Sequence, residues 1–293
     1  MKVLILGGSG LLGHKAYQIL SKYFETFITF NDYDERIKSF GIFDENHIYN
    51  EIDAFHYETI EALIYKINPQ VVINCIGIIK QVKEAQNPKI SIYLNALLPH
   101  LLSDSCKNIG ARLIQFSTDC VFSGKKGNYV ETDYSDPEDL YGRTKFLSEV
   151  INDHSLTLRI SIIGHELLTT NSLVSWFLSC KNGTVIGYTN AIYTGFPTII
   201  LCNEIARIIT NFKDMNGLYH LSSEKISKHD LLNLINRIYR LNIHIIPDIN
   251  FRCDRSLDSA KYRQHTNFVP PSWEEMTEEM YKDYLSYKRR NPI

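Results

Sequence analysis

The sequence predicts an α/β fold in which a Rossmann-type, doubly wound parallel sheet is joined to a smaller mixed α/β lobe. Two observations lead to this prediction. Short apolar runs alternate with amphipathic helical segments through residues 1–164, and the first run leads directly into a glycine-rich turn. Continuous apolar strands that alternate with helices are typical of a parallel sheet covered on both faces.

Each strand or helix expected within residues 1–164 is predicted by its local sequence. The run 3–6 is wholly apolar and ends at a glycine, and segment 26–30 is β-branched and aromatic, as strands prefer. Segment 11–23 has apolar residues at helical spacing, and the amphipathic segment 60–67 ends before Pro69. The elements expected next are a buried strand over 71–76, a helix over 90–107, a strand over 112–117, a helix over 141–152 and a strand over 156–164.

The pattern changes after Gly164, where the segments become shorter and mixed. A strand over 218–222 is expected to return to the main sheet. The other elements expected here are helices over 172–180 and 229–239, a strand over 243–246, and a C-terminal helix over 272–289 opened by Pro270, Pro271 and Ser272. We therefore assign residues 1–164 to a Rossmann domain and 165–293 to an interleaved substrate-binding lobe.

Composition excludes several classes of protein. The 293 residues are 44% hydrophobic and 22% charged, which allows a buried core, and the net charge of −2 argues against nucleic-acid binding. The first apolar run is too short for a signal peptide and no stretch is long enough to span a membrane, so a cytoplasmic protein is expected. The six cysteines form no CxxC pair, so we expect free thiols and no metal site.

Gly7, Gly10 and Gly13 form a G-x-x-G-x-x-G turn between the first strand and the first helix. This context suits a pyrophosphate, because glycines allow a tight turn and close backbone approach while a helix N-terminus offers free N–H groups. The turn therefore predicts a dinucleotide cofactor. The expected cofactor contacts are Gly7, Ser9, Gly10, Leu11, Leu12, Gly13, Asp32, Arg36, Asp53, Cys75, Ile76, Gly77, Tyr141 and Lys145.

The residues after the second strand bear on which dinucleotide binds. Asp32 favours NAD, because a carboxylate there binds ribose hydroxyls, whereas Arg36 and Lys38 lie close enough to hold a 2′-phosphate. Asp53, after the third strand, has two equal interpretations: an adenine contact or a helix cap.

Thr118, Tyr141 and Lys145 form a candidate proton-transfer set. Tyr141 and Lys145 are four residues apart on an expected helix and so share one face. A nearby ammonium lowers the pKa of a phenol, which makes the tyrosine a usable general acid at a carbonyl oxygen. Thr118, at the end of a strand, is expected to hydrogen-bond the same oxygen, and Lys145 to hold the nicotinamide ribose as well.

With these motifs the chain resembles the extended short-chain dehydrogenase/reductase family, in its dTDP-4-dehydrorhamnose reductase-like branch. The matching stretches are GGSGLLG at 7–13, INCIG at 73–77, Asn95, STDCVFSG at 117–124, YGRTK at 141–145 and SLDSAKY at 256–262. The resemblance implies reduction of a 4-keto-6-deoxy sugar nucleotide by NAD(P)H, with NADP(H) favoured over NAD(H). It implies catalytic roles for Thr118, Tyr141 and Lys145, a supporting role for Asn95, and a homodimer.

The finer resemblance concerns the substrate. NCIGIIKQ at 74–81 and the tail pattern look closest to reductases that act on UDP-linked 2-acetamido-2,6-dideoxy-hexuloses, on routes to L-rhamnosamine or L-quinovosamine. Where related reductases have tyrosine, this chain has Cys120, as GDP-fucose synthases do. His165 lies one residue from the position of the histidine in those enzymes. Because a C4 ketone acidifies the hydrogen at C3, Cys120 and His165 form a candidate acid–base pair for C3 epimerisation before reduction. The equal alternative is that both residues are structural.

The expected substrate contacts are Lys80, Thr118, Cys120, Tyr193 and Arg255. Arg255 is the first candidate for the diphosphate. Trp176 has helical apolar neighbours and is expected in the core, and Arg159, within a strand, is expected to be a paired structural charge.

Three alternatives to this function stay open. A sugar-nucleotide 4-epimerase or 4,6-dehydratase would share the fold, although Thr118 is followed by Asp119 and Cys120 rather than by the Asp-Glu pair of dehydratases. The substrate alternative is dTDP-4-dehydrorhamnose. The third is a non-catalytic NADP-binding regulatory subunit, which the intact Thr118, Tyr141 and Lys145 disfavour.

Overall fold

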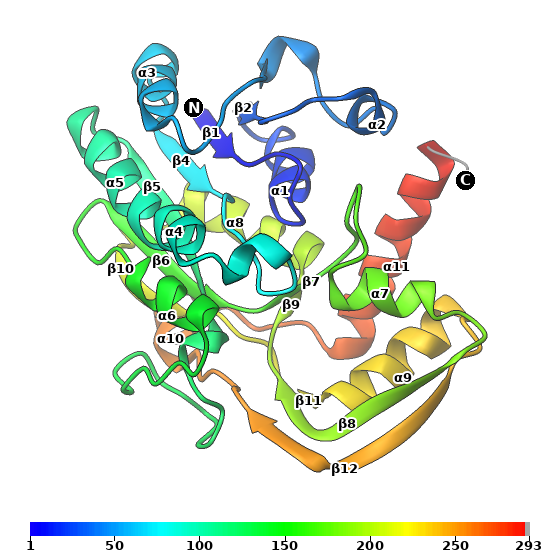
Figure 1. Ribbon diagram of the computed structural model, residues 1–293. Helices are drawn as coiled ribbons and strands as arrows, with labels where there is room; N and C mark the ends of the chain where they lie inside the picture. Colours follow the sequence, from blue (N-terminus) through cyan, green and yellow to red (C-terminus); the bar gives the residue numbers. More distant parts are fainter. Residues whose placement is uncertain (291–293) are drawn as a thin grey trace.

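The centre of the computed structural model, which describes residues 1–290, is a seven-stranded sheet in which all the strands are parallel (Figure 1). Its order is β10-β6-β5-β4-β1-β2-β3. The strands are β1 (Lys2–Leu6), β2 (Glu25–Thr29), β3 (Ile48–Tyr49), β4 (Val71–Asn74), β5 (Arg112–Thr118), β6 (Ser155–Ile160) and β10 (Gly217–His220). The strand order reverses between β1 and β4, so the loops that follow these strands diverge and leave a crevice.

Helices cover both faces of this sheet, because successive strand residues point to opposite sides. In β1, Val3 and Ile5 join one core cluster, whereas Leu4 and Leu6 join another. The first cluster takes in α1 (Gly13–Leu20), α8 (Thr198–Asn211) and α10 (Ala260–Thr266), and the second takes in α3 (Tyr57–Ile67) and α5 (Leu98–Asn108). Each fully buried aliphatic side chain contributes about 1.5–3 kcal/mol. The predicted doubly wound α/β fold is confirmed.

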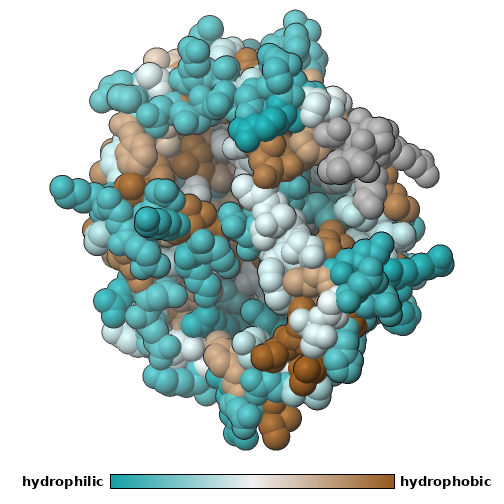
Figure 2. Space-filling model, turned by 45° about the vertical axis from the view of Figure 1, so that its right-hand side comes forward, coloured by the Kyte–Doolittle hydropathy of each residue, from teal (hydrophilic) through white to brown (hydrophobic). Residues whose placement is uncertain are grey.

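A smaller lobe follows the sixth strand. Its sheet has the order β11-β8-β12, made of β8 (Thr184–Tyr193), β11 (Ile226–Ser227) and β12 (His244–Asp254). The helices α7 (Leu173–Ser179), α9 (Lys228–Tyr239) and α11 (Trp273–Arg290) share a separate core with it. Figure 2 shows a hollow in one face of the molecule, with hydrophobic residues in its upper part and a mostly hydrophilic surface around it.

The shorter elements connect these layers. They are α2 (Glu35–Lys38), α4 (Pro88–Ser91), α6 (Leu140–Leu147), the 3₁₀ turns η1 (Glu45–His47), η2 (Lys83–Gln86) and η4 (Asp119–Val121), the π-helical segment η3 (Ile92–Leu97), and the paired strands β7 (Ile162–Ile163) and β9 (Phe196–Pro197). Over residues 1–290, no helix has both the length and the apolar character that a bilayer span requires.

Several element boundaries differ from the expectations. The strand expected over 156–164 breaks after Ile160, because Ile162 and Ile163 pair with β9 instead of the main sheet. The helix expected over 141–152 ends at Leu147. The expected helix over 90–107 runs through α4, η3 and α5, with a π-helical turn in its middle.

Two of the longer elements of the second half were not expected. Helix α8 buries apolar residues at helical spacing, including Leu201, Ile205 and Ile208, so its signal was present in the sequence. The sequence of strand β8 contains Gly187 and Asn190, which strands disfavour, so its strand pattern is weak. The strand expected near 218–222 is β10, which pairs with β6 and so returns the chain to the main sheet.

Candidate active site

The glycine turn lies directly after β1 and depends on two of its glycines. Gly7 has φ +90°, a backbone conformation that residues with a side chain rarely adopt. At Gly13, a Cβ atom would lie 2.0 Å from the backbone oxygen of Gly7, so only glycine lets the start of α1 pack against the turn.

A cavity of about 270 Å³ opens beside this turn, at the point where the strand order reverses. It is lined by Gly7, Ser9, Gly10, Thr29, Phe30, Asn31, Ile52, Asp53, Ala54, Phe55, Cys75, Ile76, Gly77 and Leu94. Seven of these residues were expected to contact a cofactor. The others come mainly from the ends of β2 and β3, the neighbouring strands, whose carboxyl ends meet at the same edge. A glycine turn, a helix N-terminus and a cavity at this edge together fit a dinucleotide.

The other expected cofactor contacts lie outside the cavity wall. Leu12, at the N-cap of α1, is buried in the core, and Leu11 lies against Gly164. Asp32 is exposed, and the Arg36 guanidinium pairs with Asp34 at 2.5 Å on the surface. Asp53 lines the cavity, as an adenine contact would. It is not a helix cap, because His56 is at the N-cap of α3 and Asp53 accepts the backbone N–H of Phe55, before the helix, at 3.0 Å.

Tyr141 lies in the first turn of α6, beside the end of β5. Asp139 caps this helix by accepting the N–H of Gly142 at 2.7 Å. A Cβ atom on Gly142 would lie 2.3 Å from the backbone oxygen of Cys120, so this glycine lets α6 approach η4 closely. The approach brings Tyr141 next to Thr118 and Cys120.

The surroundings of Tyr141 keep its phenol protonated. Burial raises its pKa well above 10, because a phenolate loses its hydration there, and the nearby Cys120 and Asp119 raise the pKa further. A hydrogen bond with Thr118 acts in the opposite direction.

The structure corrects the expected coupling between Tyr141 and Lys145. The Lys145 ammonium donates to the backbone oxygen of Phe116 at 2.6 Å, and it is not among the main influences on the Tyr141 pKa. Burial lowers the pKa of Lys145 to about 8, against the raising effect of Glu149. The shared helical face was correct, but the long lysine side chain extends to the end of β5 instead of to the phenol.

Asn95 joins the loop after β4 to helix α6. It lies within the π-helical segment η3 and is buried. Its side chain accepts from the N–H of Ile78 at 2.9 Å, donates to the carbonyl of the same residue at 2.9 Å, and donates to Thr144 at 3.4 Å. A buried amide with three partners holds the cavity wall and α6 in register. Isolated π-helical turns are frequent at functional sites.

The expected substrate contacts gather around Cys120. Its sulfur lies 3.6 Å from Nη1 of Arg255, whose Nε donates to the backbone oxygen of Phe122 at 2.8 Å. Burial raises the pKa of the Cys120 thiol to about 12, although Arg255 and Lys80 both lower it. The Arg255 guanidinium therefore faces the thiol beside the catalytic candidates, and the charge of Lys80 also acts on it.

Tyr193 joins this group from β8. Its ring is 8% exposed, and the charges of Asp119 and Cys120 act on its phenol. Its hydroxyl has no hydrogen-bond partner within the described part of the chain. A buried hydroxyl without a partner is costly, so this group is suited to a polar ligand atom.

His165 lies in a different environment from Cys120. Its Nε2 is 3.1 Å from the Tyr239 hydroxyl, and its ring stacks on Tyr284 with centroids 4.9 Å apart. Burial lowers its pKa to about 3, assisted by Lys15 and His14. The structure shows no contact between His165 and Cys120 over the described residues.

Two further expectations have clear outcomes. Trp176 was expected in the core but is 40% exposed, because its neighbour Phe177 takes the buried face of α7. Arg159 is a paired structural charge as expected: it donates to Glu149 through Nε at 2.6 Å and Nη2 at 2.7 Å.

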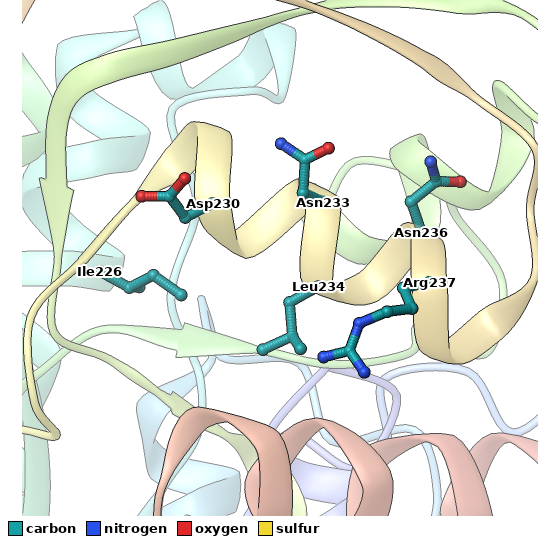
Figure 3. Close-up of a pocket in the computed structure, with 6 residues that line it drawn as sticks. All are labelled: Ile226, Asp230, Asn233, Leu234, Asn236 and Arg237. Carbon is teal, nitrogen blue, oxygen red and sulfur yellow. The ribbon is translucent and has the colours of Figure 1, made fainter.

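A second cavity, of about 590 Å³, lies on the surface of α9 and contains none of the predicted site residues. Figure 3 shows the six side chains that line it, which are Ile226, Asp230, Asn233, Leu234, Asn236 and Arg237. Their polar groups are already used: Arg237 pairs with Glu274 of α11, and Asn236 holds the backbone of Ile243 through two hydrogen bonds.

The fold, the glycine turn and the Thr–Tyr–Lys residues together define a protein of the extended short-chain dehydrogenase/reductase type. The family described as "RmlD substrate binding domain" matches residues 1–286, and the chain belongs to it. It is thus a member of the sugar-nucleotide ketoreductase family of the dTDP-4-dehydrorhamnose reductase type.

Individual relatives are distant. A dTDP-4-dehydrorhamnose reductase of Shigella flexneri is 25% identical, over 76% of this chain and 82% of the relative. Methionine adenosyltransferase 2 subunit beta of Danio rerio is also 25% identical, over 84% and 76%. Among solved structures, dTDP-4-dehydrorhamnose reductase from Bacillus anthracis in complex with NADP has a TM-score of 0.80 at 19% identity, covering 96% of this chain and 99% of the other. At that identity the likeness shows the fold alone.

Proposed function

We propose that this chain reduces the C4 keto group of a nucleotide-linked 6-deoxy-4-hexulose with a nicotinamide dinucleotide. The observation that carries the proposal is a buried phenol, Tyr141, kept protonated beside Thr118 at the carboxyl edge of a sheet that also carries a glycine turn and a cavity. A protonated acid at this position suits reduction, because the oxygen of a ketone must gain a proton as its carbon gains a hydride.

The residues of the chain have separate roles in this reaction. A dihydronicotinamide bound at the cavity would supply the hydride. Tyr141 donates its phenolic proton to the C4 oxygen, and Thr118 hydrogen-bonds the same oxygen. Lys145 holds a positive charge at the end of β5, and Asn95 keeps the cavity wall and α6 in position. The products are a C4 alcohol and an oxidised dinucleotide.

We favour NADP(H) over NAD(H). Arg36 and Lys38 follow β2, where a 2′-phosphate binds in this fold, and the Bacillus anthracis relative holds NADP. Both side chains are paired on the surface, with Asp34 and Glu35. Ion pairs on the surface contribute little to stability, so both cations are easily exchanged to a phosphate.

We propose a UDP-linked 2-acetamido-2,6-dideoxy sugar as the substrate and, on the resemblance alone, a homodimer. Arg255 and Lys80 supply the cations that a diphosphate needs. The test is to incubate the chain with NADPH and the keto sugar made enzymatically from UDP-GlcNAc, and to analyse the product by NMR. A C4 alcohol is expected. Turnover of only the dTDP-linked ketone would overturn the UDP assignment and leave the reductase assignment intact.

Epimerisation at C3 before reduction is the finest part of the proposal. Cys120 lies beside Tyr141, which supports this step, whereas His165 lies in a separate cluster. Cys120 is therefore the residue to substitute in the test. We expect Cys120→Ser to abolish deuterium incorporation at C3 from D₂O while reduction of an already epimerised ketone continues. A C120S variant that performs both steps would show that the thiol only lines the pocket.

The rate of reduction is expected to depend on pH through Lys145, because we propose that its ammonium holds the nicotinamide ribose. Its pKa of about 8 means that the ammonium is present below pH 8 and is lost above it. Since Tyr141 stays protonated to a much higher pH, kcat/KM is expected to be constant near pH 7 and to fall about tenfold per pH unit above pH 8. In Lys145→Arg this alkaline fall should disappear, because arginine keeps its charge. A wild-type profile that stays flat to pH 10 would contradict this role.

A regulatory subunit is the second candidate, favoured by the similarity to methionine adenosyltransferase 2 subunit beta. The retained Thr118, Tyr141 and Lys145 support the reductase instead. Consumption of NADPH with a 4-keto sugar nucleotide separates the two functions, since a regulatory subunit binds the dinucleotide without turnover.

A further inference from the structure

A buried chain of hydrogen bonds connects the C-terminal helix α11 to the glycine turn. His14, in the first turn of α1, is completely buried. Its Nδ1 is 2.8 Å from the backbone oxygen of Gly10, and its Nε2 is 3.0 Å from the hydroxyl of Tyr287 on α11. The proposed reaction uses none of these side-chain contacts, yet Gly10 lines the cavity at the turn.

The protonation state of His14 determines which atom donates and which accepts in each of these hydrogen bonds. Burial lowers the pKa of the imidazole to about 3, so it is neutral and carries one proton. The oxygen of Gly10 only accepts, so that proton is on Nδ1 and Nε2 is an acceptor. The Tyr287 hydroxyl then donates to Nε2, and it shares its one proton with Oε1 of Gln18, which lies 3.1 Å away.

An ion pair holds α11 in place next to this link. Lys15, which follows His14, is 2% exposed and binds Asp283 of α11 at 2.6 Å. The same ammonium lies 4.6 Å from the centre of the Tyr287 ring. Two consecutive residues of α1 therefore bind two residues of α11 that are one helical turn apart.

We propose that Tyr287 is a positioning residue for the dinucleotide site, which acts through His14 on the backbone of Gly10. The inference rests on the proposed function, because it assigns the glycine turn to a dinucleotide. A pyrophosphate needs the N–H groups of this turn in a set orientation. The Tyr287 hydroxyl is a donor to the buried Nε2, and this bond holds the imidazole in the orientation in which Nδ1 donates to the Gly10 oxygen.

The test measures dinucleotide affinity rather than turnover. In the full chain, Tyr287→Phe leaves the buried Nε2 of His14 without its hydrogen-bond donor, so the imidazole is held less firmly and its bond to Gly10 weakens. We expect the Kd for NADPH, from titration calorimetry, to rise about five- to tenfold, the equivalent of one hydrogen bond. Tyr281→Phe is the matched control, because it makes the same change on α11, at a ring that packs on Tyr239. Its Kd should equal that of the wild type.

A double-mutant cycle separates positioning from a general loss of packing. The amide of asparagine places a donor where Nδ1 lies, so His14→Asn should keep the bond to Gly10 without needing Tyr287. We expect H14N to bind NADPH within about twofold of the wild type, and Tyr287→Phe to cause no further loss in that background. Additive losses would overturn the inference.

Hydrogen exchange of the free protein gives a readout that needs no cofactor. Amides of residues 7–14 should exchange faster in Y287F than in Y281F or the wild type. An unchanged Kd and unchanged exchange in a folded Y287F would overturn the inference alone. A wild-type chain that binds neither NADPH nor NADH would overturn the proposed function as well.

Discussion

Tyr141→Phe is expected to lower kcat for reduction by about 10²–10⁴-fold, the usual contribution of a general acid. Phenylalanine keeps the ring in its buried place and removes only the proton that the C4 oxygen needs. The dinucleotide should still bind, because the glycine turn and the cavity are untouched. Single-turnover kinetics with NADPH and calorimetric titration of the dinucleotide measure the two effects separately.

Tyr134→Phe is the control for this experiment. Tyr134 is 88% exposed and has no part in the proposed reaction, so the same chemical change there should leave turnover unchanged. Undiminished reduction by Y141F would show that another group supplies the proton, and it would remove the main support for the reductase assignment.

Gly13→Ala is expected to destabilise the fold and to abolish dinucleotide binding. The new Cβ would lie 2.0 Å from the oxygen of Gly7, which is backbone and cannot rotate away. Overpacking of this kind costs about 1–3 kcal/mol or more. Because the turn must move to relieve it, we expect the free energy of unfolding to fall by that amount and the Kd for NADPH to rise at least about 100-fold.

Gly10→Ala separates the needs of the ligand from those of the fold. A Cβ at Gly10 would meet the oxygen of Gly7 at 3.6 Å, an ordinary contact, so the free energy of unfolding should stay within about 0.5–1 kcal/mol of the wild type. Gly10 lines the cavity, and a methyl group there should still weaken binding of the pyrophosphate. A G10A variant with wild-type affinity would show that the dinucleotide does not approach the turn at this residue.

The parts of the site that follow from local pattern were predictable. The glycine spacing of 7–13 predicted the turn, and the apolar runs predicted the doubly wound sheet, because both depend on neighbours along the chain. Tyr141 and Lys145 were correctly placed on one helix, α6. Seven cavity residues were also predicted, since the carboxyl ends of parallel strands meet at one edge.

Side-chain direction over long distances depended on the tertiary structure. Arg255 reaches Cys120 across 135 positions of the sequence, and His165 joins the aromatic cluster of Tyr239 and Tyr284 instead of that thiol. Lys145 donates to Phe116 instead of lowering the Tyr141 pKa. Periodicity shows which face of an element a residue occupies. What that face touches is decided by how sheets and helices far apart in the chain pack together, and the pKa of each buried group follows from those contacts.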